Sequence, residues 1–292
     1  MSVPVVFIHS GNSTYLFNTF YQLKQSNKDV LIYLIGTKES KVYSSMVHHV
    51  DINDYMGEAD AFAPLYKHFS TNSPAFELIC IQRWFVLNAF MLKNGIEKCL
   101  YLDSDVLLYG KIEELYPTYE KFGMTICGIS GHTNFLNRSV LAEFCKYIID
   151  RYTEDRISEK LEQHFRELVY KHGAGGVSDM TFFAWFADKF PEKVFNLNTP
   201  ESQICFDISI QHGDDVFQMD NKIKKVIFKK KKPYCLHKSD NGHVLFHSLH
   251  FQGRDPKKIM QSYIQEKNSG FFFKKAYFYV HYIIQKIALK FF

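Results

Sequence analysis

Residues 98–108 read K-C-L-Y-L-D-S-D-V-L-L, an apolar run that leads into two aspartates one residue apart. Such a run is typical of a strand that is covered on both faces. Open α/β sheets place their ligands beyond the carboxyl ends of their strands. Two carboxylates at this position can converge on one hard divalent cation, such as Mg²⁺ or Mn²⁺. Asp103 and Asp105 are therefore candidate metal ligands, although two aspartates at this spacing are usually a solvated turn.

A second polar motif comes late in the chain, where residues 246–258 read F-H-S-L-H-F-Q-G-R-D-P-K-K. An imidazole at a strand end can complete the coordination of a cation. Gly253 would let backbone N–H groups approach a phosphate, and Lys257 or Lys258 could neutralise it. The alternative is a strand with a buried structural histidine, followed by a solvated basic turn.

The rest of the chain alternates between apolar strands and amphipathic helices. This order predicts an α/β fold with a mostly parallel sheet that is flanked by helices. The expected helices include 76–92, 139–152 and 157–170. The expected strands are 5–8, 30–35, 98–102, 122–127, 193–197, 204–210, 224–228 and 244–251.

Composition excludes several classes of protein. The 292 residues are 46% hydrophobic, which is enough for a large core and argues against a disordered chain. The 35 basic and 31 acidic residues are too balanced to indicate nucleic-acid binding. None of the six cysteines forms a C-x-x-C pair, so we expect reduced thiols rather than a zinc cluster or disulfides. Residues 3–8 lack the features of a signal peptide, and we expect a cytoplasmic protein.

Taken together, Y-L-D-S-D-V-L-L and the late H-F-Q-G with a following lysine resemble GT-A glycosyltransferases, especially small bacterial lipopolysaccharide-type (galactosyl)transferases. The resemblance implies a Rossmann-like nucleotide-diphospho-sugar transferase domain over residues 1–265. It also implies transfer of a hexose from a nucleotide-diphosphate sugar, with UDP as the expected nucleotide, to a saccharide or lipid-linked saccharide. In that family the aspartate pair and the histidine bind Mn²⁺ (or Mg²⁺) together with the diphosphate.

Carried over by position, the resemblance makes Asp103, Asp105 and His250 metal ligands, and it places Gly253 and Lys257 at the diphosphate. Ser104, between the aspartates, would also contact the donor. The galactosyltransferase motif reads H-x-x-G-x-x-K-P, whereas here the proline precedes the lysine. This departure leaves open whether Lys257 or Lys258 contacts phosphate.

Further expected contacts follow from the same resemblance. His9, Gly11 and Asn12 come after the first strand, where the nucleoside is held; an ordinary capped turn is the alternative. Arg83 would lie near the donor, unless it merely covers its helix. Asp179, after the glycine-rich loop 173–176, is the candidate catalytic residue, while capping of the next helix by Ser178 or Asp179 is the structural alternative. Residues 131–134, just before a helix, would line the acceptor side.

Residues 266–292 form a basic, aromatic tail, and from Ser269 onward the tail contains no acidic residue. As a helix it would place rings at the lipid headgroup boundary and lysines against anionic lipid. Its lysines argue against a spanning helix. We expect peripheral contact with the inner face of a membrane; packing on the domain or on a second copy is the alternative. The lysine run 229–232 is expected to be a solvated loop.

Two other functions remain open. A haloacid-dehalogenase-type phosphatase also uses an apolar strand followed by Asp-x-Asp, but its motif normally ends the first strand of the core, and strands are expected here before residue 98. A non-catalytic, nucleotide-binding, membrane-associated module is the second alternative. Such a module would need neither the aspartate pair nor the late histidine.

Overall fold

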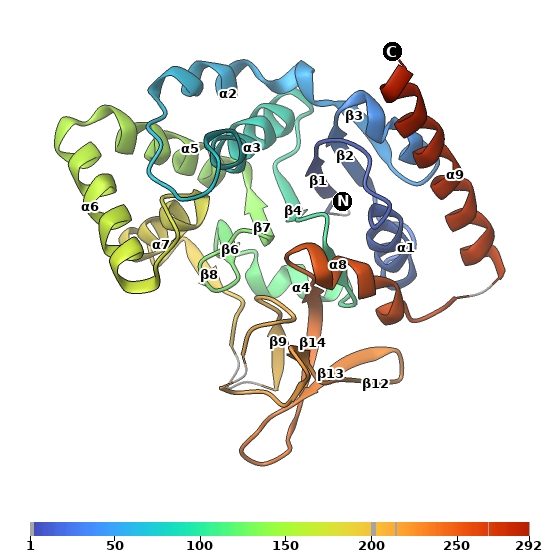
Figure 1. Cartoon of the computed structure of the whole chain (residues 1–292). Coiled ribbons are helices and arrows are strands. Elements are labelled where there is room, and N and C mark those ends of the chain that lie inside the picture. The colour runs from blue at the N-terminus through green and yellow to red at the C-terminus, as the bar shows by residue number, and fades with distance from the viewer. Residues whose placement is uncertain (1–2, 200–202, 214, 268, 292) are drawn as a thin grey trace. The chain divides into compact units, whose positions relative to one another are not determined.

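The computed structural model describes residues 3–199, 203–213, 215–267 and 269–291 (Figure 1). The contacts within the chain divide it into two compact units. Unit 1 contains Met1–Val50, Leu102–Thr118 and Asn196–Phe292. Unit 2 contains Asp51–Tyr101 and Tyr119–Phe195. The predicted division into a catalytic domain of residues 1–265 and a tail of residues 266–292 remains a prediction.

Unit 1 begins with a parallel pair of buried strands. β1 (Val5–His9) pairs with β2 (Ile32–Gly36) in register from Val5↔Ile32 to His9↔Gly36. A parallel pair needs a crossover connection, and α1 (Leu16–Ser26) provides it. Beyond β2 follow the 3₁₀ segment η1 (Lys38–Ser45) and the neighbouring strand β3 (His48–Asp51). Phe7, Phe17 and Phe20 are fully buried between these elements.

A second, largely antiparallel sheet completes the framework of unit 1. Its order is β12-β13-β14-β5, and β9 pairs with β14 in parallel. The strands are β5 (Val106–Leu108), β9 (Ile204–Phe206), β12 (Val226–Lys229), β13 (Lys232–Leu236) and β14 (His243–His250). The remaining elements are α4 (Ile112–Tyr119), the hairpin β10 (Met219–Asp220) and β11 (Ile223–Lys224), α8 (Arg254–Ile259) and η4 (Met260–Tyr263).

The lysine run 229–232 differs from the expected solvated loop. Lys229 ends β12 and Lys232 begins β13, so only Lys230 and Lys231 form the turn of a β-hairpin. All four lysines are exposed, as expected, but the loop is only a two-residue turn, because the flanking strands extend to Lys229 and Lys232.

The C-terminal tail is helical, as predicted, and forms α9 (Ser269–Phe291). Phe271 and Phe278 lie seven residues apart, on one face of the helix, and both are buried. Their rings lie within 5.5 Å, centroid to centroid, of the ring of Phe17, and Phe278 stacks on Tyr43 at 5.1 Å. One face of α9 therefore packs on α1 and η1 of unit 1.

Unit 2 is built around α3 (Pro74–Lys93), whose first turn is capped by the Ser73 hydroxyl. This helix is long and apolar enough to cross a membrane by length and composition, but more than half of it is buried inside the protein. Trp84, Phe85 and Phe90 are among its buried residues. α3 is therefore a core helix of this unit.

Strands and further helices surround α3. The strands lie in the order β4 (Lys98–Leu102), β7 (Thr133–Asn137), β6 (Met124–Ile126) and β8 (Val194–Asn196), with β6 and β7 antiparallel. The helices are η2 (Ile52–Tyr55), α2 (Gly57–Phe62), η3 (Ala63–Leu65), α5 (Arg138–Thr153), α6 (Asp155–His172) and α7 (Asp179–Lys189). The predicted α/β class, with a mostly parallel sheet flanked by helices, is confirmed, and the antiparallel pair makes the sheet mixed.

Candidate metal and donor site

The aspartate pair lies in a tight turn between β4 and β5. The backbone N–H of Val106 donates to the Asp103 carbonyl at 3.1 Å, which closes the turn. Leu102 and Val106, the apolar residues on either side of the turn, are fully buried, so they fix the position of the polar triplet. Asp105 is only 7% exposed. A buried carboxylate needs a cation or several donors nearby.

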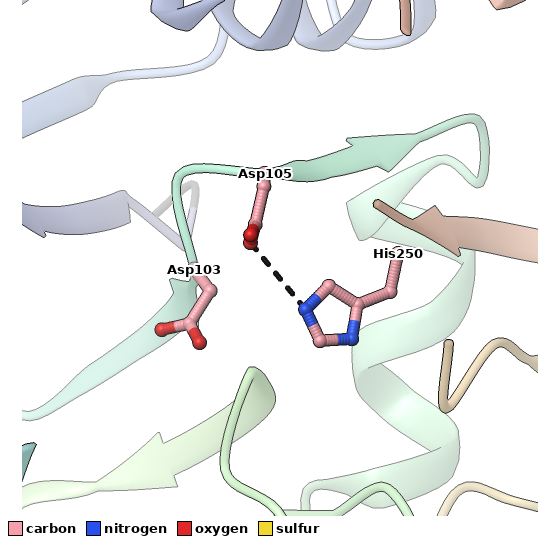
Figure 2. A group of neighbouring side chains, drawn as sticks. All are labelled: Asp103, Asp105 and His250. Carbon is pink, nitrogen blue, oxygen red and sulfur yellow. Dashed lines mark ion pairs between the residues drawn. The ribbon is translucent and has the colours of Figure 1, made fainter. Parts of the chain in front are cut away.

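The pairing of β5 with β14 brings the late histidine to this turn. His250 stands opposite Val106 in the antiparallel register, and the Phe251 N–H donates to the Asp105 carbonyl at 2.9 Å. Each of the residues Asp103, Asp105 and His250 offers a ligand atom within 4.8 Å of the others (Figure 2). Two carboxylates and one imidazole suit a hard or borderline divalent cation such as Mn²⁺ or Mg²⁺. The donor set therefore fits the metal that the motifs imply.

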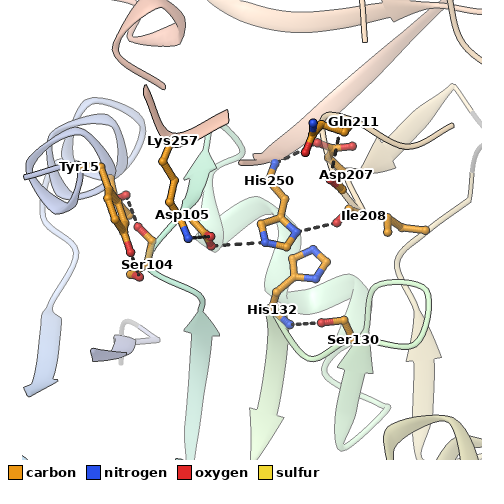
Figure 3. A network of polar contacts seen from close by, with 12 residues as sticks. Tyr15, Ser104, Asp105, Ser130, His132, Asp207, Ile208, Gln211, His250 and Lys257 are labelled. Carbon is orange, nitrogen blue, oxygen red and sulfur yellow. Dashed lines mark hydrogen bonds and ion pairs between the residues drawn. The ribbon is translucent and has the colours of Figure 1, made fainter. Parts of the chain in front are cut away.

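A buried network fixes the orientation of the His250 ring (Figure 3). Its Nδ1 lies 2.6 Å from the carbonyl oxygen of Ile208. A carbonyl can only accept, so Nδ1 carries the proton, and Nε2 is directed toward Asp105 Oδ1 at 3.4 Å. The His250 backbone N–H donates to Asp207 Oδ2 at 3.0 Å, and Asp207 Oδ1 accepts from Lys224 Nζ at 2.8 Å. A hydrogen-bonded outer shell of this kind is typical of metal-ligating histidines.

Lys257 is the second basic group at Asp105. Gly253 precedes α8 with a φ of +90°, a backbone conformation that favours glycine, and so starts the helix directly after β14. One turn later, Lys257 Nζ lies 2.8 Å from Asp105 Oδ2. Lys258 instead pairs with the exposed Asp255 at 2.6 Å. Of the two candidate lysines, the structure brings Lys257 to the aspartates.

The charges at the turn shift one another's pKa values. Burial raises the pKa of Asp105, but the hydrogen bond and charge of His250 and the charge of Lys257 outweigh burial and hold it well below the usual range. Burial lowers the pKa of His250, yet Asp105 raises it above its usual value overall. The pKa of Lys257 is likewise raised by Asp105 against the effect of burial. In this structure the negative turn is thus balanced by the protein's own cations.

Ser104 connects the aspartate turn to the loop after β1. Its hydroxyl lies 3.0 Å from His9 Nδ1 and 3.2 Å from the Tyr15 hydroxyl, and its carbonyl accepts from the Thr19 hydroxyl at 2.5 Å. Burial, countered in part by Asp105, lowers the pKa of His9 to about 4, so its ring is neutral at neutral pH. His9 and Ser104, both predicted donor contacts, therefore lie together. Tyr15 and Thr19, which also contact Ser104, were not predicted.

The other two loop residues contact different parts of unit 1. The Gly11 N–H donates to the Thr37 hydroxyl at 3.0 Å, and Gly11 has a φ of +81°. Asn12 Nδ2 donates to Gln285 of α9 at 2.6 Å. The Asn12 Oδ1 atom is buried and has no hydrogen-bond partner among the described residues. A buried acceptor without a partner is costly, so it is available to a ligand's donor group.

In unit 2, Arg83 and Asp179 pair with each other. Arg83 Nη2 lies 2.5 Å from Asp179 Oδ2, and the Trp84 indole N–H donates to the same oxygen at 3.0 Å. Asp179 is 3% exposed. The Ser178 hydroxyl accepts from the Met180 N–H and caps α7, so capping is the role of Ser178 and leaves the Asp179 carboxylate for other interactions. The predicted roles of Arg83 and Asp179 toward a donor stay predictions.

Residues 131–134, also in unit 2, lead into a strand before the helix. Thr133 and Asn134 are fully buried and belong to β7. This strand, which was not expected from residue 133 onward, leads directly into the helix α5. The Thr133 Oγ1 and Asn134 Nδ2 atoms have no hydrogen-bond partner among the described residues. Their predicted place on the acceptor side stays a prediction.

Sequence reasoning missed the residues that support His250. Asp207 and Lys224 are buried almost completely; Asp207 directly follows the short strand β9, and Lys224 ends the short strand β11. Asp207, inside the run I-C-F-D-I-S-I, was the available signal, because a charge in an apolar run is rarely buried unless it is paired. Their partnership depends on tertiary pairing that a single sequence does not specify.

No family model and no curated protein sequence matches this chain. Several solved structures are similar to it. Galactosyltransferase LgtC in complex with donor and acceptor sugar analogs is 11% identical, with a TM-score of 0.47, and the match covers 93% of this chain and 100% of that one. Mouse xyloside xylosyltransferase 1 is 13% identical with a TM-score of 0.43 and coverage of 68% and 86%. Glycosyltransferase GlyE of Streptococcus pneumoniae is 13% identical with a TM-score of 0.41 and coverage of 95% and 64%.

These proteins are glycosyltransferases by description, which is the class that the two motifs resemble. With TM-scores below 0.5, these similarities do not show what this chain does. The function is therefore argued below from the residues of the site.

Proposed function

We propose that this protein is a metal-dependent glycosyltransferase of the GT-A class that moves a hexose from a UDP-sugar to a saccharide or lipid-linked saccharide. The single observation that carries the proposal is the convergence of Asp103, Asp105 and His250 with Lys257 bound to Asp105. Carboxylates alone would suit many cation sites. A lysine within reach of the same aspartate adds a group that binds phosphate, as a nucleoside diphosphate requires.

Asp103, Asp105 and His250 would hold Mn²⁺ or Mg²⁺, which supplies charge stabilisation to a departing diphosphate. The other residues take the roles that the sequence resemblance implies for them. Lys257 leaves Asp105 and neutralises a phosphate oxygen, while the backbone at Gly253 permits close approach of the diphosphate. His9, Gly11, Asn12 and Ser104 hold the nucleoside. Arg83 and Asp179 act on the donor sugar, with Asp179 as the catalytic carboxylate.

Calorimetric titration tests the donor site directly. UDP, GDP, CDP and inorganic phosphate are titrated with and without Mn²⁺ into wild type, Asp105→Asn and the matched exposed control Asp255→Asn. We expect one nucleoside diphosphate to bind only with metal, and its affinity to fall at least about tenfold in Asp105→Asn alone. Absence of nucleotide binding in wild type under every condition contradicts the proposal, and hydrolysis of an aryl phosphate would then support the phosphatase alternative.

We further propose that α9 contacts the inner face of a membrane, where lipid-linked acceptors lie. Opposite the buried Phe271 and Phe278, the helix exposes an apolar stripe: Phe273, Tyr277, Val280, Ile284 and Ile287. These positions recur at helical spacing on one face. Lys274, Lys275 and Lys286 flank the packed face, and α9 contains no acidic residue. One face of α9 therefore packs on unit 1, and the opposite face is the one proposed to contact lipid. From the sequence alone, packing and lipid contact were alternatives.

A further inference from the structure

A second polar site lies in unit 1, apart from the aspartate turn. A cavity of about 520 Å³ opens between the loop after α1, the start of α4 and the β12–β13 turn. It shares no residue with the aspartate turn. The Tyr109 N–H donates to the His247 carbonyl at 2.8 Å, and both residues line the cavity. His247 and His250 are three residues apart on β14, so the two sites lie at opposite ends of this stretch, about 10 Å along the strand.

The cavity has an excess of positive charge. Its lining contains five lysines but only two glutamates: Lys28, Lys111, Lys230, Lys231 and Lys232 against Glu114 and Glu266. Lys111 pairs with Glu114 at 2.8 Å, and Lys231 pairs with Glu266. In the part of the chain that the structure describes, Lys28, Lys230 and Lys232 make no ion pair. Lysines from three separate segments thus converge on one cavity, which differs from a solvated charge run on a single face.

The backbone of the β12–β13 turn is unusual for lysine. Lys230 and Lys231 have φ values of +49° and +66°, in the left-handed region that Asn and Gly favour in two-residue hairpin turns. Each non-glycine residue in this region costs roughly 1 kcal/mol. In addition, Lys229 stands directly opposite Lys232 in the register, and like charges in such a pair repel. The lysines at these positions of the hairpin therefore destabilise it locally.

We propose that this basic cavity binds a phosphate group, carried either by a phosphorylated saccharide or by a lipid headgroup. A bound phosphate would offset both the repulsion at the turn and the unpaired charge of Lys28, Lys230 and Lys232. The lysines converge on one cavity rather than form an extended stripe, so a single phosphate-bearing group fits better than a nucleic-acid backbone. The proposal does not depend on sugar transfer.

A turn variant separates binding from folding. Lys230→Asn with Lys231→Gly places the preferred residues in the turn, so this double variant should be at least as stable as wild type. We expect its affinity for inorganic phosphate and pyrophosphate, measured by calorimetry on the full chain, to fall about tenfold or more. Lys222→Asn with Lys225→Asn, which replaces two exposed lysines outside the cavity, removes the same charge and should bind as wild type does.

A second comparison assigns the binding to this cavity. If phosphate binds at the aspartate turn, Lys257→Met should abolish its binding. If phosphate binds in the cavity, Lys257→Met should still bind it and the turn variant should not. Vesicles of phosphatidylglycerol, against phosphatidylcholine, identify a lipid source if the turn variant weakens their binding; free phosphate binding without this effect identifies a soluble source. Equal binding of all probes by wild type and the turn variant, or no binding by wild type, overturns the proposal.

Discussion

Lys257 Nζ lies 2.8 Å from Asp105 Oδ2, so a lysine ammonium interacts with the carboxylate that a metal would need. His250, whose pKa is raised, interacts with the other oxygen of Asp105 at 3.4 Å. The protein thus carries its own positive charge at the turn. A divalent cation at this turn would have to displace Lys257 from Asp105, and the displaced ammonium would then be available to a diphosphate.

Lys257→Met removes this competing cation. We expect Mn²⁺ affinity without nucleotide to rise about tenfold, since the metal no longer has to break a partly exposed ion pair worth about 1.4 kcal/mol. Affinity for the nucleoside diphosphate in the presence of metal should fall instead. Lys258→Met, whose lysine pairs with Asp255, is the control and should change neither quantity. Calorimetry or Mn²⁺ electron paramagnetic resonance measures both, and unchanged Mn²⁺ affinity in Lys257→Met contradicts the competition.

Substitutions in the Arg83–Asp179 pair test whether the Asp179 carboxylate has a structural or a catalytic role. Arg83→Met leaves the buried Asp179 carboxylate without its cation, although the Trp84 indole still donates to it, and should lower the free energy of unfolding by about 3 kcal/mol. Adding Asp179→Asn removes the unpaired charge and should restore most of that stability. If Asp179 acts in transfer, the single variant Asp179→Asn, which keeps Arg83, should be at least about a hundredfold reduced in kcat. A kcat close to wild type in Asp179→Asn would show that the carboxylate only supports the fold.

His247 should make stability depend on pH. Burial, together with the charge of Lys232, lowers the pKa of His247 from 6.5 to about 4. Above pH 6.5 the ring is neutral in both states and contributes no pH dependence. Between pH 6.5 and 4 only the unfolded state gains the proton, so the folded state loses about 1.4 kcal/mol of stability per pH unit.

Urea unfolding at pH 7 and pH 5 measures this loss. We expect His247→Gln to reduce the difference in unfolding free energy between the two pH values by about 2 kcal/mol. His243→Gln, at the exposed start of the same strand, is the matched control and should leave that difference as in wild type. An unchanged difference in His247→Gln would assign the pH dependence to other groups.

The two faces of α9 should respond differently to substitution. Phe271→Ala removes a fully buried ring and should cost about 3–5 kcal/mol of folding stability. Phe273→Ser with Ile284→Ser changes exposed side chains and should leave stability within about 1 kcal/mol. The same double substitution should reduce the fraction of protein that sediments with anionic vesicles about tenfold or more. Tyr170→Ser, a highly exposed aromatic residue of unit 2, serves as the control, and equal sedimentation of all variants contradicts membrane contact through this face.

Much of the fold was predictable from periodicity. Residues 76–92 were expected as a helix and form most of α3, because its apolar positions and terminal signals agree. Residues 98–102 form β4 as expected. The short strand β5 directly after the aspartates was not predicted, since three residues carry no period of their own and the strand depends on pairing with β14.

The candidate site was predictable only in part. Asp103, Asp105 and His250 were expected together, and their ligand atoms do converge, because strand ends carry residues distant in sequence to one edge. That Lys257 rather than Lys258 contacts Asp105 follows from the start of α8 at Gly253, which sets the rotation of the helix. Such a rotation is a tertiary property, and the displaced proline in the motif did not specify it.

The contact between Asn12 and Gln285 has a practical consequence for anyone who shortens this chain. Removing the last 24 residues to obtain a more tractable sample would take away the hydrogen-bond partner of a residue in the loop after β1. It would also leave the rings of Phe17 and Tyr43 without the aromatic cover that Phe278 provides. A weak nucleotide affinity in such a truncated protein would report damage to that loop, and only point substitutions on the outer face of the helix keep the two effects apart.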